Sequence, residues 1–218
     1  MTIDHVCVCI FAKPPRRGEV KTRLAAEVGA ELASHLAQAF LDDTWTALSD
    51  VPWITPVIAS TEFFGQTDQR EIWLQGDGQL GDRIVRILRR ALLLAPAAFA
   101  IGSDSPALPR RLLEQARGTL ADVDAVLGPS HDGGFYLLGL KTCPPGLLCD
   151  IPWSDPQTCE FTSSRLRSLH YRVGMLDQWF DVDTYADLTR LRQSIDAGLI
   201  SAPQTEAVLR NLYTETSS

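Results

Sequence analysis

HVCVCIFA at residues 5–12 is followed directly by KPPRRGEVKT at residues 13–22. The first stretch is apolar and rich in β-branched residues, which predicts a buried strand. The second stretch contains two prolines and a glycine, which predicts a loop. A helix is predicted to begin next, with Thr22 as its N-cap and Arg23 as its first residue. A buried strand, a loop and a helix in this order are typical of an α/β protein.

The same alternation continues along the chain. Strands are predicted at 54–60, 71–75, 97–102, 123–128, 134–140 and 171–176, and helices at 31–48, 80–95, 109–120, 158–170, 185–195 and 203–213. The segment 31–48 is expected to continue the helix that begins at Arg23. Alternation of this kind favours a mainly parallel sheet flanked by helices. Two consecutive strands within 123–140 break the alternation, so the predicted sheet is mixed.

Length and composition limit the classes of function. The chain has 218 residues, 45% of them hydrophobic, which predicts a single domain over residues 1–218. No run of about 20 apolar residues exists, so no membrane partner is expected. The formal net charge of −7 argues against binding to a nucleic-acid polymer. The N-terminal segment has no basic leader, so the cytoplasm is the expected location, for a monomer or a homodimer.

Positive charge is concentrated in the predicted loop after the first strand. Residues 13–23 contain one acid, Glu19, and five cations, namely Lys13, Arg16, Arg17, Lys21 and Arg23. Gly18 allows the backbone to approach a ligand closely, and a helix N-terminus favours an anion. We therefore predict that this loop binds phosphate through Lys21 and Arg23 first, and Lys13 and Arg16 next. The alternative is a solvated basic loop, and the pattern is not a P-loop.

Acidic residues follow two other predicted strands. Asp104 lies in the stretch GSDSP at 102–106, and Asp181 and Asp183 lie in FDVDT at 180–184. Ligands of open α/β sheets bind at the carboxyl ends of the strands, so we expect these acids to meet. Mg²⁺ in nucleotide sites takes one or two carboxylates with phosphate oxygens and water. Helix capping is the alternative, by Asp104 for one helix and by Asp183 or Thr184 for the other.

Two glycine-containing segments are candidates for the remaining pocket walls. GDGQLGD at 76–82 could bring backbone against a base or a ribose. HDGGFY at 131–136 places polar residues and two glycines at a turn, where they could contact an acceptor. A plain hairpin turn explains the second segment equally well. Trp153 is interpreted as part of the core or of a pocket wall.

Six motifs, taken together, resemble a known family. They are FAKPPRRGEVKTRL, LGDR at 80–83, GSDSPALP at 102–109, GPSHDGGFYLLGL at 128–140, DIPWS at 150–154 and FDVDTYADL at 180–188. The motifs resemble those of bacterial glycosyltransferase-like proteins, or nucleotide-diphospho-sugar transferases, related to 2-phospho-L-lactate guanylyltransferase. The resemblance covers nearly the whole chain. It implies the glycosyltransferase-A fold, a Rossmann-like mixed sheet.

The resemblance also implies a role for each motif. The loop 13–23 would hold the donor phosphates, and Asp104 would bind the metal together with Asp183 or Asp181. The residues implied near the nucleotide are Leu80, Gly81, Asp82 and Ser103, and those implied near the acceptor are Asp132, Gly133, Gly134 and Trp153.

Two departures from the family pattern favour a triphosphate donor. Ser103-Asp104-Ser105 has a single acid where many glycosyltransferases have D-x-D, and the pair Arg16-Arg17 is unusually cationic. The predicted function is nucleotidyl transfer, dependent on Mg²⁺ or Mn²⁺, from an NTP to a small phosphate- or phosphonate-bearing acceptor, with release of pyrophosphate. Lys21, Arg23 and Asp104 are the predicted catalytic residues. The alternatives are glycosyl transfer from a nucleotide-diphospho-sugar and nucleotide binding without catalysis.

Overall fold

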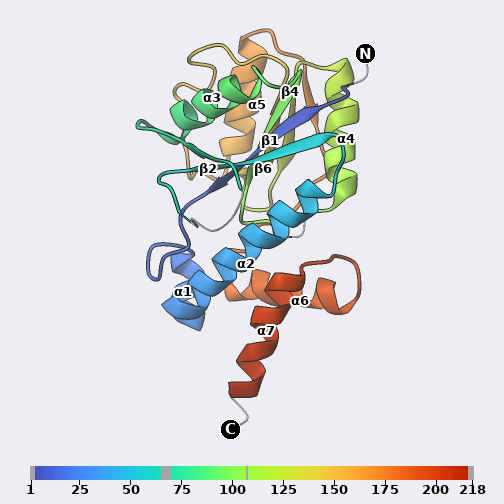
Figure 1. The fold of residues 1–218 in the computed structure, drawn as a ribbon. Helices are drawn as coiled ribbons and strands as arrows, with labels where there is room; N and C mark the ends of the chain where they lie inside the picture. Colours follow the sequence, from blue (N-terminus) through green and yellow to red (C-terminus); the bar gives the residue numbers. More distant parts are fainter. Residues whose placement is uncertain (1–2, 65–69, 107, 216–218) are drawn as a thin grey trace.

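The computed structural model, which describes residues 3–64, 70–106 and 108–215, has a central sheet with helices on both faces (Figure 1). The strands are β1 (Val6–Ala12), β2 (Ile54–Ser60), β3 (Ile72–Leu74), β4 (Ala97–Gly102), β5 (Ala125–Pro129), β6 (Phe135–Leu140) and β7 (Val173–Met175). The helices are α1 (Thr22–Val28), α2 (Ala30–Ser49), α3 (Leu80–Ala91), α4 (Arg110–Asp122), α5 (Thr158–Ser168), α6 (Tyr185–Asp196) and α7 (Pro203–Glu215). Every strand and helix predicted from the sequence is present.

The sheet has the strand order β3-β2-β1-β4-β6-β5-β7 in the described part of the chain. β1 pairs in parallel with β2 on one side and with β4 on the other. β6 runs antiparallel to both of its neighbours, β4 and β5, which confirms the predicted mixed sheet. Because the strand order reverses at β1, the loops that follow β1 and β4 diverge there and leave room for a ligand.

Alternation along β1 explains how one strand serves two cores. Cys7 and Cys9 point to the face covered by α3 and α5, whereas Val6, Val8 and Ile10 point to the face covered by α2 and α4. All five side chains are buried. Burial on both faces is what the continuous apolar run in the sequence predicted.

No helix among the described residues is long and apolar enough to cross a bilayer.

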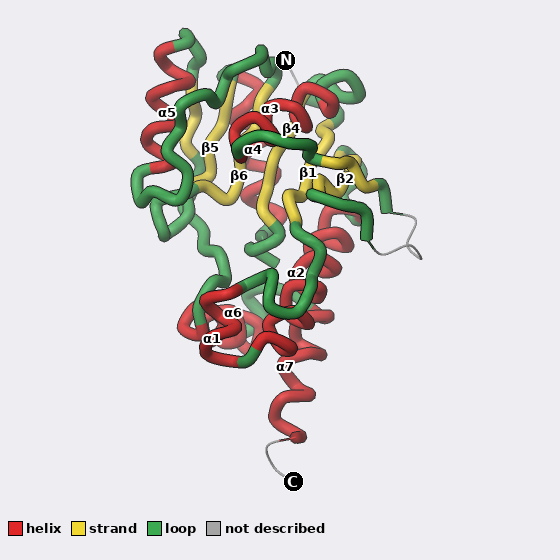
Figure 2. Tube along the Cα trace, turned by 90° about the vertical axis from the view of Figure 1, so that its left-hand side faces the viewer, coloured by secondary structure: helices red, strands yellow, loops and turns green. Residues whose placement is uncertain are grey.

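A third group of apolar side chains lies beside the carboxyl ends of the strands, where α1 and α7 pack against α2 and α6 packs against α1 (Figure 2). Its buried members are Leu24, Leu36, Phe40, Phe180, Val182, Leu188, Leu191, Ala202 and Leu209. Asp43 of α2 fixes the start of α7. Its carboxylate accepts hydrogen bonds from the backbone N–H groups of Gln204 and Thr205, each at 2.9 Å, and from the Thr205 hydroxyl at 2.7 Å.

Asp43→Ala is expected to lower the free energy of unfolding by about 2–3 kcal/mol, because three donors at a buried helix start lose their charged acceptor. Asp43 is 3% exposed, so water cannot readily replace the carboxylate. Urea denaturation would measure the change. Asp50→Ala, at an exposed position at the end of α2, is the control and is expected to change little. Equal stability of the two variants would contradict the capping role of Asp43.

Three predicted helix starts differ from the structure. Lys21, not Thr22, is the N-cap of α1, with a left-handed backbone at φ 48°, and Thr22 is the first helical residue. Gly29, at φ 88°, separates α1 from α2, so the predicted continuous helix is wrong. Pro109 is the N-cap of α4 rather than its first residue, because its ψ of 134° is extended.

Candidate functional site

Two adjoining cavities lie at the carboxyl ends of the central strands. The first cavity, of about 580 Å³, is lined by the loops after β1 and β4 and by the start of α3. The second cavity, of about 530 Å³, is lined by the β5–β6 turn, the start of β6 and residues 153–158. Both are lined by Phe11, Arg23, Leu80, Ser154 and Asp183. The two cavities are therefore neighbouring parts of one depression in the protein.

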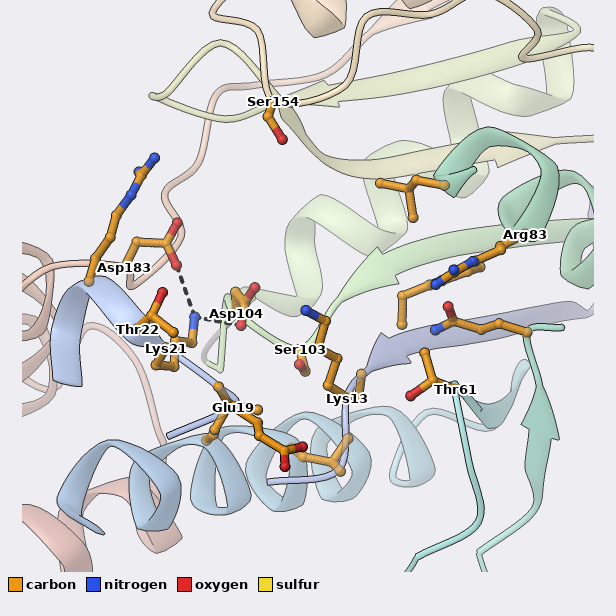
Figure 3. A pocket seen from close by; sticks show the side chains of 18 residues that line it. Lys13, Glu19, Lys21, Thr22, Thr61, Arg83, Ser103, Asp104, Ser154 and Asp183 are labelled. Carbon is orange, nitrogen blue, oxygen red and sulfur yellow. Dashed lines mark hydrogen bonds and ion pairs between the residues drawn. The ribbon is translucent and has the colours of Figure 1, made fainter. Parts of the chain in front are cut away.

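Lys21 lies between two carboxylates that come from different strand ends (Figure 3). Its Nζ is 2.5 Å from Asp104 Oδ1 and 3.2 Å from Asp183 Oδ1, and it donates a hydrogen bond to the carbonyl of Val182 at 2.9 Å. The Lys21 side chain is 5% exposed, whereas those of Asp104 and Asp183 are 49% and 40% exposed. The structure thus brings the two predicted acids together, with one cation buried beneath them.

Local backbone geometry produces this arrangement. The N–H of Val182 donates to the carbonyl of Asp104 at 2.8 Å, which ties the segment before α6 to the end of β4. Thr184 caps α6 in a capping box with Asp187, so Asp183 is not the cap and its carboxylate is available to the cavity. The left-handed backbone of Lys21 is unusual for a residue with a side chain, and such strain is common at functional sites.

The first cavity contains four cations, which are Lys13, Lys21, Arg23 and Arg83. Three of them were predicted to bind phosphate, and the predicted Ser103 lines the cavity as well. Arg83 was not predicted as a phosphate contact, although it belongs to the LGDR motif. Thr61 and Gln75 were also missed. They directly follow β2 and β3, so the rule about strand ends could have found them.

Four residues predicted to bind the nucleotide line neither cavity. Arg16 pairs with Glu62 at 2.6 Å. Gly18 is exposed in the loop, with a positive φ of 81°. Gly81 is packed so tightly that a Cβ would lie 2.6 Å from the carbonyl oxygen of Leu148. Asp82 accepts from the N–H of Gln79 at 3.1 Å and caps α3. Close packing against Leu148 explains the glycine at position 81, and helix capping explains the acid at position 82.

Asp181, the alternative metal ligand, also lines neither cavity. Its carboxylate accepts a hydrogen bond from the Ser105 hydroxyl, which also contacts the carbonyl of Phe180. Burial raises the pKa of Asp181 to about 6, although the Ser105 hydrogen bond opposes the increase. Asp183 therefore lines both cavities whereas Asp181 lines neither, and the Ser105 hydroxyl holds the Asp181 carboxylate.

Asp181→Asn is expected to raise the free energy of unfolding by about 1–3 kcal/mol at pH 8 and to change it little at pH 4. The Asp181 pKa lies above its ordinary value of 3.8, so the folded chain binds more protons than the unfolded chain between roughly pH 4 and 6. Stability from this group therefore falls as the pH rises through that window. Urea denaturation at both pH values, with EDTA present, measures the difference. An equal effect at pH 4 and pH 8 would contradict it.

The second cavity is formed around the turn between β5 and β6. Asp132, Gly134 and Trp153 line it, as predicted for an acceptor pocket, whereas Gly133 does not. Gly133 has a φ of 88°, and a Cβ there would lie 1.7 Å from the carbonyl oxygen of Pro156. Gly133 therefore lets the turn pack closely on the following loop, and supports the cavity wall from behind.

The described residues contain no group of three or more His, Cys, Asp or Glu side chains that could hold a metal. Asp104 and Asp183 nevertheless suit a hard cation, because their half-exposed carboxylates converge on one point. Each uses its Oδ1 atom for Lys21, and neither Oδ2 atom has a hydrogen-bond partner within 3–64, 70–106 and 108–215. Phosphate oxygens and water would have to complete the coordination.

Known proteins resemble this chain in both sequence and structure. Residues 44–155 match the family model described as "Uncharacterized protein conserved in bacteria (DUF2064)". A crystal structure from Desulfovibrio desulfuricans G20, whose name places it among the nucleotide-diphospho-sugar transferases, is 28% identical with a TM-score of 0.84. That match covers 97% of this chain and 95% of that chain, and it confirms the resemblance inferred from the motifs.

Two further solved structures share the fold at lower identity. One is CMP:2-keto-3-deoxy-manno-octonic acid synthetase complexed with CTP, with 14% identity, a TM-score of 0.53, and coverage of 89% of this chain and 99% of that chain. The other is 4-diphosphocytidyl-2C-methyl-D-erythritol synthase from Anaerococcus prevotii DSM 20548, with 10% identity and a TM-score of 0.55. That match covers 88% of this chain and 99% of that chain. They support the predicted Rossmann-like fold. No curated protein matches the chain.

Proposed function

The chain belongs to the bacterial family DUF2064, and from its site and its similarity to the Desulfovibrio desulfuricans structure we propose that it is a transferase that uses a nucleotide donor. The favoured reaction is transfer of a nucleotidyl group from an NTP to a small acceptor, with release of pyrophosphate. One observation carries the proposal, namely the buried Lys21 between Asp104 and Asp183 in a cavity that also contains Lys13, Arg23 and Arg83. Such a mixture of cations and carboxylates suits a polyphosphate with its metal.

Nucleotidyl transfer depends on positioning and on neutralising charge rather than on covalent catalysis. Lys21 and Arg23 would stabilise the charge that develops on the α-phosphate and on the leaving pyrophosphate. Lys13 and Arg83 line the same cavity and would hold the rest of the triphosphate. A Mg²⁺ or Mn²⁺ ion held by Asp104 and Asp183 would neutralise further charge on the phosphate oxygens.

Glycosyl transfer from a nucleotide-diphospho-sugar is the second candidate. The name of the Desulfovibrio desulfuricans protein favours glycosyl transfer, because that protein has a higher sequence identity to this chain than the two synthases have. The same two cavities would then hold the nucleoside diphosphate and the sugar. This reaction would release a nucleoside diphosphate and no pyrophosphate, so analysis of the products separates the two candidates.

A thermal-shift panel of NTPs and nucleotide-diphospho-sugars, each with and without Mg²⁺ or Mn²⁺, tests the proposal. A ligand that binds only the folded state raises the melting temperature. We expect a metal-dependent increase with at least one NTP. An increase only with a nucleotide-diphospho-sugar would support glycosyl transfer. Binding without turnover against any acceptor would support a non-catalytic nucleotide-binding protein, and no increase with any nucleotide would refute the whole proposal.

A further inference from the structure

The two adjoining cavities differ in charge and in the character of their walls. From this difference we infer that the acceptor is an uncharged ring compound carrying hydroxyl groups, and that Asp132 activates the hydroxyl that attacks the donor. The inference rests on the proposed function, and it replaces the phosphate-bearing acceptor that the sequence predicted.

Charge separates the cavities. The first cavity is lined by four cations, Lys13, Lys21, Arg23 and Arg83, and by three acids, Glu19, Asp104 and Asp183. The second cavity is lined by a single cation, Arg23, and by three acids, Asp132, Asp155 and Asp183. A phosphate monoester carries nearly two negative charges at neutral pH, and like charges a few ångströms apart repel strongly. A phosphate is therefore favoured in the first cavity and disfavoured in the second.

Arg23 does not change this balance. It lines both cavities, so it lies where the donor and the acceptor would meet. Its guanidinium would already serve the donor phosphates, which carry more charge than the acceptor. Among the residues that the structure describes, the second cavity thus has no cation of its own for an acceptor phosphate.

Aromatic side chains provide the apolar part of the second cavity. Phe135 and Trp153 meet edge to face, with ring centroids 6.1 Å apart and planes at 66°. Leu80 and Ile84 of α3 line the same cavity. A pocket with apolar walls and a few polar groups at fixed positions is the usual form of a small-molecule site. The C–H face of a ring compound would pack on the aromatic wall, and its hydroxyl groups would donate to the carboxylates.

Asp132, on the turn between β5 and β6, is the carboxylate that we assign as the base. Its Oδ1 accepts from the N–H of Gly134 at 3.0 Å and from the hydroxyl of Ser130, which fixes the orientation of the carboxylate. Its Oδ2 has no hydrogen-bond partner in the described part of the chain. The turn itself is rigid, because Gly133 packs on Pro156 without room for a Cβ, and its carbonyl accepts from the N–H of Cys159 at 3.0 Å.

The proposed step transfers the nucleotidyl group from the NTP to the acceptor oxygen. The acceptor hydroxyl gives its proton to the Asp132 carboxylate, and its oxygen forms a new bond to the α-phosphorus of the NTP. The bond from that phosphorus to the bridging oxygen breaks, and pyrophosphate leaves with the electron pair. The leaving group departs on the side of Lys21, inside the cationic first cavity. The two cavities would therefore keep the nucleophile and the leaving group on opposite sides of the reacting phosphorus.

Binding of matched probes tests the acceptor class. The probes are methyl α-D-glucoside, methyl α-D-mannoside and myo-inositol, each compared with its own monophosphate. The readout is the NMR signal of the Trp153 indole N–H, assigned with Trp153→Phe. We expect at least one uncharged probe to shift this signal, and its affinity to fall about tenfold in Asp132→Asn. Phosphates that bind as tightly as their uncharged partners, or no binding by any uncharged probe, would overturn the inference.

Kinetics test the role of Asp132 separately from donor binding. With the NTP identified by thermal shift and an uncharged acceptor, Asp132→Asn is expected to lower the rate of transfer by about 10²–10⁴-fold. The affinity for the NTP should stay unchanged, and the rise of rate with pH that reports the base should disappear. Asp177→Asn, a surface acid that lines neither cavity, is the control. A wild-type protein that binds no NTP refutes the proposed function, whereas NTP binding with transfer to a phosphate ester refutes only this inference.

Discussion

Replacing Asp104 by alanine is expected to lower turnover by about 10³-fold or more, which corresponds to roughly 4 kcal/mol of lost transition-state stabilisation. The carboxylate is one of only two that converge on Lys21 among the described residues, and it faces the first cavity. Its loss would leave Asp183 alone to hold a cation. We therefore expect metal-dependent binding of the NTP to disappear as well. Pyrophosphate release and calorimetric titration with Mg²⁺ and the NTP measure the two effects.

The fold should survive this substitution. Lys21 keeps Asp183 and the carbonyl of Val182 as partners, and Asp104 is half-exposed. Circular dichroism and the melting temperature would establish that the variant is folded. Asp50→Ala is the control, because Asp50 is an exposed acid at the end of α2 that lines neither cavity. A folded Asp104→Ala protein with normal turnover would remove Asp104 from the proposed site.

The fold could be predicted from the sequence because local patterns and packing agree. The apolar run of β1 is buried on both sides, and the apolar face of α3 packs on the sheet. The end of α3 was placed too late for a physical reason. Leu92, Leu93 and Leu94 extend the apolar pattern, but the helix ends at Ala91 ahead of Pro96, and Leu93 is 85% exposed. Apolar sequence alone does not show whether a side chain is buried.

The meeting of Asp104 and Asp183 could also be predicted, because both follow elements that end at the same edge of the sheet. The position of Lys21 between them could not. It depends on a left-handed backbone at a residue with a side chain, whereas the sequence suggests Gly18 for such a conformation. The sequence predicts that Lys21 binds phosphate and that Asp104 and Asp183 bind a metal. It does not predict that the Lys21 ammonium contacts the two carboxylates.

Two acids of the candidate pocket segments, Asp82 and Asp132, also make local structural contacts. Asp82 belongs to the LGDR motif, and it also stands three residues after Gln79, where it completes a capping box. The structure shows the capping contact. Asp132 has a local role in its turn too, yet only one of its oxygens is used there, and it still lines the second cavity. Each carboxylate uses one oxygen in its structural contact, so the difference between them is the cavity lining, which includes Asp132 and not Asp82.

Lys21→Met is expected to lower turnover by about 10²–10³-fold and, at the same time, to raise the affinity for Mg²⁺ by roughly tenfold. Methionine preserves much of the length of the side chain but removes the charge. Turnover falls because the developing charge on the phosphates loses a cation. Affinity for the metal rises because the ammonium no longer neutralises Asp104 and Asp183, from which it is separated by 2.5 Å and 3.2 Å.

These opposite changes distinguish the role of Lys21 from that of an ordinary phosphate contact. Lys13→Met is the control, because Lys13 lines the same cavity but pairs with neither carboxylate in the part of the chain that the structure describes. That control should weaken NTP binding and leave the Mg²⁺ affinity of the free protein unchanged. Calorimetric titration with Mg²⁺ in the absence of nucleotide measures both variants. An unchanged or weaker Mg²⁺ affinity in folded Lys21→Met would mean that Asp104 and Asp183 do not form the metal site, and that the buried ammonium is the only cation they hold.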